Sequence, residues 1–183
     1  MQVPTLLITG SPGVGKTSTA VEINDQLAGR SVPNAVIDLD SMAWQWPPSS
    51  HFNTDLVFKN LESIWPNYKA HGATHLVLAR VIENRAELSR YRTAIPGAEI
   101  AICRLVATDA TRVERLQNRM PAGASLDWHI RRTLELERQF ESLAIEDFVV
   151  ESDERSLREV ATEVLLRAGW IADVDQGSRT RGR

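Results

Sequence analysis

The sequence predicts an α/β fold built around a parallel sheet. Short apolar segments alternate with segments of helical periodicity, and a glycine-rich segment joins the first apolar segment to the helix after it. Strands that alternate with helices form βαβ units, whose right-handed crossovers place helices on both faces of the sheet. Ligands of such sheets bind at the carboxyl ends of the strands. A functional site is therefore expected in the segments that follow the predicted strands.

The first half of the chain predicts three strands and three helices. Apolar stretches predict strands at residues 3–9, 35–39 and 75–79. The segments between and after them predict helices at residues 18–28, 54–70 and 83–93. The buried face of the second helix is expected to contain Leu56, Leu61, Ile64 and Tyr68. Because proline has no N–H group, Pro66 is expected to kink or end this helix.

The second half predicts two further strands and three helices. The strands are expected at residues 99–107 and 147–150, and the helices at residues 108–120, 127–144 and 156–168. Ser156 and Glu159 have the spacing of a capping box, which favours a helix start at this point. Residues 173–183 are polar and are expected to form a disordered tail, so the folded domain is expected to span residues 1–172.

Composition excludes several classes of protein. The length of 183 residues fits one domain. The net charge of −3 argues against a general nucleic-acid-binding face, and no apolar run is long enough to span a membrane. The first residues lack the pattern of a signal peptide, and one cysteine, Cys103, permits no internal disulfide. We expect a cytoplasmic protein, monomeric or homodimeric, that binds neither nucleic acid nor membranes.

The glycine-rich segment matches the full G-x-x-x-x-G-K-[ST] pattern of a phosphate-binding P-loop. It reads Gly10-Ser11-Pro12-Gly13-Val14-Gly15-Lys16-Thr17, and Ser18 follows in the predicted helix. Backbone N–H groups of such a loop and the N-terminus of the next helix bind phosphate oxygens. Lys16 is suited to the β and γ phosphates, and the Thr17 hydroxyl to Mg²⁺. Residues 10–18 are therefore expected to bind ATP with Mg²⁺.

Two aspartates follow the second predicted strand. If that segment stays extended, Asp38 and Asp40 point to the same side, beside the P-loop. One carboxylate is suited to hold Mg²⁺ through water, and the other to accept the proton of an attacking hydroxyl group. Acidic residues are also common in turns, which leaves a purely structural role open.

Arginines flank a segment that is suited to a mobile lid. Residues 120–125 are small and contain proline and glycine, and the lid is expected at about residues 119–130. Guanidinium groups stabilise the charge on a phosphoryl group during its transfer. The candidates before the lid are Arg112, Arg115 and Arg119, and those beyond it are Arg131 and Arg132.

These motifs together resemble the group of small P-loop kinases that includes shikimate kinase, gluconate kinase and chloramphenicol phosphotransferase. The resemblance implies an adenylate-kinase-like, three-layer fold whose five strands lie in the order 2-3-1-4-5. It implies that Arg119 is the lid arginine, that Arg112 or Arg115 lies near the nucleotide, and that adenine lies near the loop containing Arg155. It places Asp38 near Mg²⁺ and Asp40 at the acceptor in the shikimate kinase pattern, whereas the chloramphenicol phosphotransferase pattern makes the earlier aspartate the base.

The acceptor region differs from that of nucleotide kinases. No arginine lies between residues 31 and 79, where related nucleoside monophosphate kinases hold the acceptor phosphate. Trp44 and Trp46 are equally suited to contact an acceptor ring or to fill the core. Arg80 stands where the shikimate kinase pattern has glycines, and it is expected to bind an acidic group of the acceptor or to pair with Asp38 or Asp40.

The function expected from these features is transfer of the ATP γ-phosphoryl group to a hydroxyl of a small-molecule acceptor. Lys16, Asp38 or Asp40, and Arg119 are the expected catalytic residues, and Asp40, Trp44, Trp46 and Arg80 are the expected acceptor residues. A nucleoside or nucleotide kinase is one alternative. The other is a nucleotide-dependent switch or ATPase with no dedicated acceptor.

Overall fold

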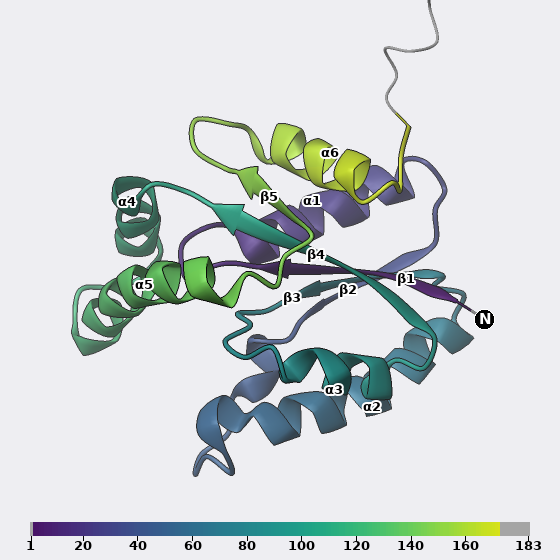
Figure 1. Ribbon diagram of the computed structural model, residues 1–183, viewed down its shortest axis with the longest axis horizontal. Coiled ribbons are helices and arrows are strands. Elements are labelled where there is room, and N and C mark those ends of the chain that lie inside the picture. Colours follow the sequence, from purple (N-terminus) through teal and green to yellow (C-terminus); the bar gives the residue numbers. More distant parts are fainter. Residues whose placement is uncertain (1, 173–183) are drawn as a thin grey trace, which may run out of the picture.

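Five parallel strands form one sheet in the order β2-β3-β1-β4-β5, which confirms the expected topology (Figure 1). The strands are β1 (Val3–Thr9), β2 (Asn34–Asp38), β3 (His75–Ala79), β4 (Ala98–Val106) and β5 (Phe148–Glu151). This computed structural model describes residues 2–172, so the tail predicted at residues 173–183 lies outside the described residues. No helix within residues 2–172 has the length and apolar character needed to cross a bilayer.

Helices cover both faces of the sheet, and each face has its own apolar core. The helices α1 (Lys16–Ala28) and α6 (Leu157–Arg167) lie on one face, and α2 (Thr54–Ala70) and α3 (Glu87–Ala94) lie on the other (Figure 1). In β1, Leu7 packs toward α2 and α3, whereas Leu6 and Ile8 pack toward α1 and α6. A parallel strand that is buried on both faces needs apolar residues at successive positions, which explains the continuous apolar run in β1.

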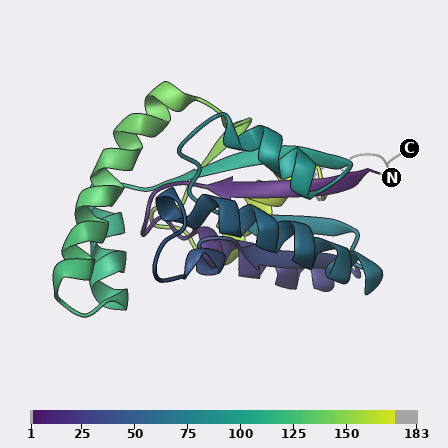
Figure 2. The ribbon, with the colours of Figure 1, turned by 90° about the horizontal axis from the view of Figure 1, so that it is seen from below.

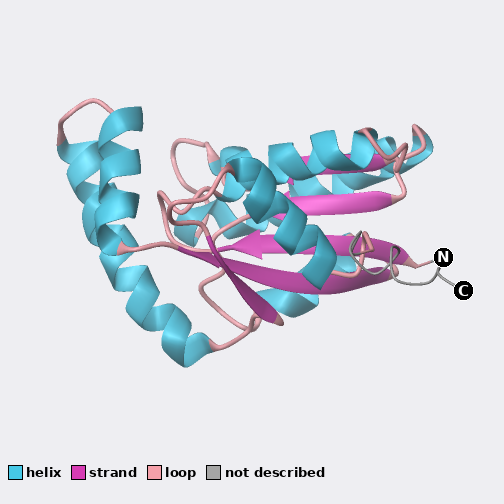
Figure 3. Ribbon diagram, turned by 90° about the horizontal axis from the view of Figure 1, so that it is seen from above, coloured by secondary structure: helices cyan, strands magenta, loops and turns pink. Residues whose placement is uncertain are grey.

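The helices α4 (Asp109–Arg119) and α5 (Ala124–Leu143) lie together beyond the carboxyl ends of the strands (Figures 2 and 3). Only residues 120–123 connect them, so most of the lid expected at residues 119–130 is the first part of α5. The Thr108 hydroxyl caps α4 by accepting a hydrogen bond from the N–H of Thr111. The capping box expected at Ser156 and Glu159 is present at the start of α6.

The structure contradicts part of two expectations about α2. Its buried face is formed by Val57, Phe58, Leu61 and Trp65. Leu61 is buried and Ile64 packs against the same core, as expected. Tyr68, by contrast, is 42% exposed, because the helix docks with Phe58 and Trp65 toward the sheet. Pro66 does not end the helix, which continues to Ala70. The carbonyl that lacks a donor belongs to the exposed residue Glu62, where water can replace the missing hydrogen bond.

The helix expected to begin at residue 83 begins at Glu87 instead. The side chain of Asn84 accepts a hydrogen bond from the N–H of Ala86 at 2.8 Å, which stabilises a turn before the helix. The helix is also less exposed than its polar sequence suggests, because Tyr91 and Ala94 are buried against the sheet. This turn positions residues 83–87 at the carboxyl edge of the sheet, next to the site described below.

Candidate active site

The P-loop connects β1 to α1 and lies against the end of β4 and the first turn of α4. Gly10 and Gly13 both have positive φ angles, 139° and 85°. A Cβ atom at Gly10 would lie 2.6 Å from the carbonyl oxygen of Leu105, and one at Gly13 would lie 2.6 Å from that of Arg112. Only glycine satisfies both the backbone conformation and this close approach, so the loop has the backbone geometry expected of a phosphate-binding loop.

Lys16 is the first residue of α1, and its side chain lies inside the P-loop. Its Nζ donates hydrogen bonds to the carbonyl oxygens of Gly10 at 2.9 Å and Ser11 at 3.3 Å. Burial lowers the pKa of Lys16, whereas the nearby carboxylates of Asp40 and Asp38 act to raise it. The loop therefore holds a cationic donor beside the two aspartates that the sequence singled out.

Asp38 links the end of β2 to the start of α1. Its Oδ2 accepts a hydrogen bond from the Thr17 hydroxyl at 2.6 Å, and its Oδ1 accepts from the N–H groups of Asp40 and Ser41 at 3.0 and 3.3 Å. A hydroxyl and a carboxylate in contact are the oxygen ligands that Mg²⁺ uses together with nucleotide phosphates. Thr17 and Asp38 therefore fit the Mg²⁺ site expected for them.

Asp40 lies in a different environment from Asp38. The strand ends at Asp38, so the two aspartates do not lie on an extended segment as expected, and Asp40 instead precedes a 3₁₀ turn at Ser41–Ala43. Although the residue is accessible to solvent, its carboxyl group lines a cavity. Desolvation there raises the pKa of Asp40, against the opposing charges of Lys16 and Arg80. A carboxylate with a raised pKa in a cleft is suited to accept a proton.

The cavity has a volume of about 1030 Å³ and extends from Pro12 and Asp40 toward α2, α3 and α5. Trp44 and Trp46 line it and are 90% and 89% exposed, so they do not belong to the core. Other aromatic side chains in its lining include Phe52 and Trp128. The structure thus contradicts the packing interpretation of Trp44 and Trp46, and their contact with an acceptor stays a prediction.

Three arginines line the cavity, and each is paired with a carboxylate. Buried Arg80 contacts Glu87 at 3.3 Å and donates to the Thr54 hydroxyl at 3.3 Å. Arg90 contacts Asp55 at 2.9 Å, and Arg132 contacts Glu83. The absence of arginine from residues 31–79 therefore does not leave this region without guanidinium groups, because α3 and α5 supply them from other parts of the chain.

The arginines of α4 have different surroundings. Arg112 is buried and pairs with Asp109 and, at 3.4 Å, with Glu137. Arg115 donates to the carbonyl oxygens of Val14 at 3.2 Å and Ser152 at 2.8 Å. The Arg115 guanidinium thus joins the P-loop to the loop after β5, whereas that of Arg112 is linked to the P-loop through Glu137, which accepts from Ser11. The contact with the nucleotide that the resemblance implies for one of them stays a prediction.

Arg119 and Arg155 contrast with each other. Arg119 is exposed at the end of α4 and forms no ion pair or hydrogen bond within residues 2–172. Its charge nevertheless acts on Lys16 and contributes to lowering the Lys16 pKa. Arg155 donates to Glu163 of α6 at 2.6 Å and to the carbonyl oxygen of Glu151 at 3.0 Å. Arg119 is therefore unpaired within residues 2–172, whereas Arg155 is held against α6.

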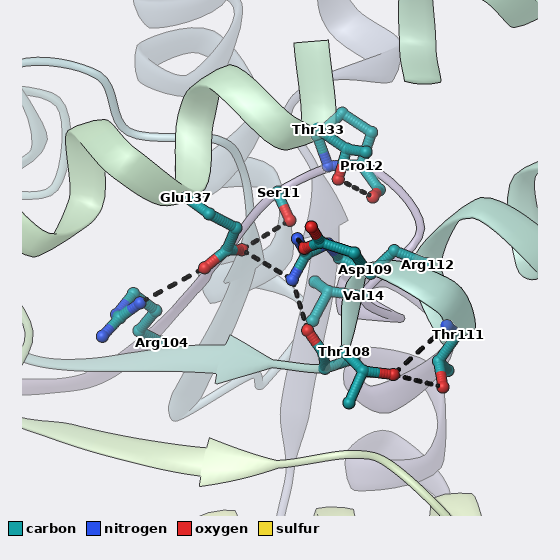
Figure 4. A network of polar contacts seen from close by, with 12 residues as sticks. Ser11, Pro12, Val14, Arg104, Thr108, Asp109, Thr111, Arg112, Thr133 and Glu137 are labelled. Carbon is teal, nitrogen blue, oxygen red and sulfur yellow. Dashed lines mark hydrogen bonds and ion pairs between the residues drawn. The ribbon is translucent and has the colours of Figure 1, made fainter. Parts of the chain in front are cut away.

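Two residues of α5 that the sequence did not single out hold the outer side of the P-loop (Figure 4). Glu137 accepts a hydrogen bond from the Ser11 hydroxyl at 2.7 Å, and it pairs with Arg104 at 3.6 Å. Thr133 donates to the carbonyl oxygen of Pro12 at 2.8 Å. Thr133 and Glu137 are four residues apart and therefore lie on one face of the helix. This spacing is the only local feature of the sequence that indicates their shared contact with the P-loop.

Comparisons with known proteins give structural matches only. No protein-family model matches the chain, and no curated protein sequence matches it. Among solved structures, the tunicamycin resistance protein of Deinococcus radiodurans matches with a TM-score of 0.63 and 17% identity, over 92% of this chain and 96% of that one. A gluconokinase of Sinorhizobium meliloti 1021 matches with a TM-score of 0.59 and 17% identity, over 93% and 94% of the two chains.

The shikimate kinase of Aquifex aeolicus is similar as well, with a TM-score of 0.56 and 13% identity over 91% of this chain and 96% of that chain. These matches span nearly the full length of this chain and of each matched chain. The comparisons agree with the resemblance inferred from the motifs. The chain has the fold of this group of small P-loop kinases.

Proposed function

We propose that the protein transfers the γ-phosphoryl group of ATP to a hydroxyl group of a small-molecule acceptor. One observation carries this proposal. The Thr17–Asp38 contact at 2.6 Å, the Lys16 ammonium and the Asp40 carboxylate converge at the point where the P-loop meets a cavity of about 1030 Å³. Phosphate-binding groups thus lie directly beside a space suited to an acceptor.

The contacts divide the roles of the two aspartates. Both oxygens of Asp38 already accept hydrogen bonds, one from Thr17 and one from the backbone after β2. Asp38 is therefore proposed as the Mg²⁺-side carboxylate, with Thr17. Mg²⁺ supplies charge neutralisation of the β and γ phosphates when the nucleotide is bound. Asp40, which lines the cavity, is proposed as the base.

The proposed step conserves atoms and charge. Asp40 accepts the proton of the acceptor hydroxyl, and the acceptor oxygen forms a bond to the γ phosphorus. The bond between the γ phosphorus and the bridging oxygen breaks, and its electron pair leaves with ADP. Lys16 binds the phosphates, and Arg119 is proposed to contact the transferring group because its guanidinium has no partner within residues 2–172.

The test is ADP release from Mg-ATP in the presence of amino alcohols, sugars, nucleosides, nucleoside monophosphates and aromatic antibiotics. Lys16→Ala serves as the blank, because it removes the charge that holds the phosphates. Strong stimulation by one acceptor class, lost in Lys16→Ala and in Asp40→Asn, is the expected result. Slow ATP turnover that no compound changes would instead favour a nucleotide switch.

A further inference from the structure

The charges around the cavity are arranged so that its arginines are already neutralised. Three arginines and three acidic residues line it. Arg80 and Glu87 form a pair of which little is exposed, 5% and 14% of the two side chains. Arg132 pairs with Glu83 and also with Glu135 at 3.5 Å. The third arginine, Arg90, is paired with Asp55 at 2.9 Å. An acceptor phosphate or carboxylate would have to compete with these carboxylates for the guanidinium groups.

An anionic acceptor would also meet Asp40, the third acidic residue of the lining. The Asp40 carboxylate must be charged to act as a base, and a like charge nearby is repelled in a partly desolvated site. Lys16 offsets part of the Asp40 charge, but its Nζ donates to Gly10 and Ser11 inside the P-loop, and Lys16 is not among the residues that line the cavity. The electrostatics of the cavity therefore disfavour an acidic acceptor.

Two indole side chains present free faces at the same cavity. Trp44 and Trp46 are the most exposed of the large apolar side chains within residues 2–172. Neither forms an aromatic pair there, whereas Phe52 and Trp128 pack on each other with ring centroids 6.3 Å apart. Indole faces that remain in water have an unfavourable hydration that a flat apolar ligand surface removes.

The size of the cavity points in the same direction. A volume of about 1030 Å³ is at the upper end of the roughly 300–1,000 Å³ that drug-sized ligands occupy. A small hydroxy acid would leave most of this space, including both indoles, without contact. A larger ligand with at least one ring can contact Asp40 with a hydroxyl group and the indoles with its ring face.

From these observations we propose that the acceptor is an uncharged, drug-sized molecule with a hydroxyl group and a planar or sugar ring that stacks on Trp44 and Trp46. This inference rests on the proposed kinase function and names the substrate class of that site. Arg80 and Arg132, held by Glu87 and Glu83, form the walls of the site and do not bind an acidic group of the acceptor.

The test uses pairs of compounds with the same ring system, of which one member carries an anionic group in place of a hydroxyl or hydroxymethyl group. Uridine is compared with uridine 5′-monophosphate, and 4-nitrophenyl β-glucoside with 4-nitrophenyl β-glucuronide. ADP release measures phosphorylation, and isothermal calorimetry measures binding of the same compounds to the full chain. At least tenfold higher kcat/KM, or tenfold tighter binding, is expected for an uncharged member over its anionic partner.

The two readouts separate the failure of this inference from the failure of the kinase function. Phosphorylation that favours anionic members would overturn the inference and leave the kinase function intact. Tighter calorimetric binding of uncharged members with no phosphorylation would support the inference and contradict the kinase function. If no uncharged member binds, the inference is wrong.

Two substitutions test the residues that carry the argument. Trp44→Ala is expected to raise the acceptor KM about tenfold, which corresponds to about 1.4 kcal/mol of stacking, with kcat nearly unchanged. Tyr68→Ala, which removes an exposed aromatic side chain near the end of α2, is the matched control. An equal KM in the two variants would remove Trp44 from the acceptor site.

The second substitution frees a guanidinium group. Glu87→Gln removes the carboxylate partner of Arg80, so kcat/KM for the anionic members is expected to rise at least fivefold relative to the uncharged members. Glu99→Gln, at an exposed residue near the amino end of β4, is the control and should leave the ratio unchanged. An unchanged ratio in Glu87→Gln as well would show that the ion pair does not set acceptor charge.

Discussion

Replacement of Glu137 by glutamine tests whether α5 holds the P-loop in place. The Glu137 carboxylate accepts a hydrogen bond from Ser11 at 2.7 Å and pairs with Arg112 at 3.4 Å and Arg104 at 3.6 Å (Figure 4). Glutamine has nearly the same shape and retains one acceptor oxygen, but it removes the charge. The substitution therefore isolates the electrostatic part of this contact from its packing.

The size of the effect follows from the burial of the partners. Only 2% of the Arg112 side chain is exposed, and its remaining carboxylate partner, Asp109, is 72% exposed and hence more strongly screened. A hydrogen bond to a charged group contributes about 1.5–3 kcal/mol. Because glutamine retains one acceptor, we expect a loss of about 2 kcal/mol in unfolding free energy. For a chain of this length that corresponds to a fall in Tm of roughly 4–8 °C.

Thermal unfolding by circular dichroism measures the stability change, and the KM for ATP measures its consequence at the P-loop. Glu141→Gln is the matched control, because Glu141 is an exposed residue one turn further along α5. The control should change the unfolding free energy by less than about 0.5 kcal/mol. We expect a higher KM for ATP in Glu137→Gln alone. Equal Tm and KM values in the two variants would refute the coupling of α5 to the loop.

Three further predictions concern the loop, the base and the end of α4. Gly13→Ala places a Cβ 2.6 Å from the Arg112 carbonyl oxygen at a positive φ, so it should cost at least about 1–2 kcal/mol in stability and abolish ATP binding by calorimetry; retained binding would contradict the close approach. Because desolvation raises the pKa of Asp40, protonation inactivates the base at a higher pH than for an ordinary aspartate. Accordingly, kcat/KM should fall on acidification through that raised pKa, and the residual activity of Asp40→Asn should not show this fall. If the fall persists in Asp40→Asn, another group causes it. Arg119→Ala should lower kcat about 10³-fold with Tm unchanged, since the side chain is exposed and unpaired within residues 2–172. An unchanged kcat would show that Arg119 takes no part in phosphoryl transfer.

The parts of the site that are contiguous in sequence could be predicted from the sequence. The P-loop pattern, the apolar strand before it and the helix after it are local features, and they predicted the strand–loop–helix unit, although α1 begins at Lys16 and not at Ser18. The strand order followed from the resemblance that these motifs support, and the structure confirms it. The proximity of Asp38 to Thr17 was predicted as well, because the carboxyl ends of parallel strands share one edge of the sheet.

The features that depend on contacts between distant segments could not be predicted. Glu137 approaches Ser11 across 126 positions of sequence, and no motif marks a carboxylate that accepts from a P-loop serine. Of the three arginines around the cavity, Arg80 and Arg132 were singled out from the sequence, but Arg90 was missed and the carboxylate partners of all three could not be foreseen. The exposure of Trp44 and Trp46 was undecided, because composition does not distinguish an indole in a core from one at a ligand site.

The position of a buried helical face depends on packing in a similar way. In α2 the apolar residues allow two neighbouring stripes, and the core selects the one that contains Phe58 and Trp65. Tyr68, which belongs to the other stripe, remains partly in water. Local periodicity identified the helix but not the rotation with which it docks on the sheet.

The fate of the γ phosphate tests the central claim most directly. The protein is incubated with Mg-ATP that carries a radioactive γ phosphate, together with the compound that most stimulates ADP release, and the labelled products are separated. The account predicts that the label moves to the acceptor in step with ADP formation, and that Asp40→Asn abolishes this transfer while retaining ATP binding. Label found only in inorganic phosphate, at a rate that the acceptor does not change, would contradict the account.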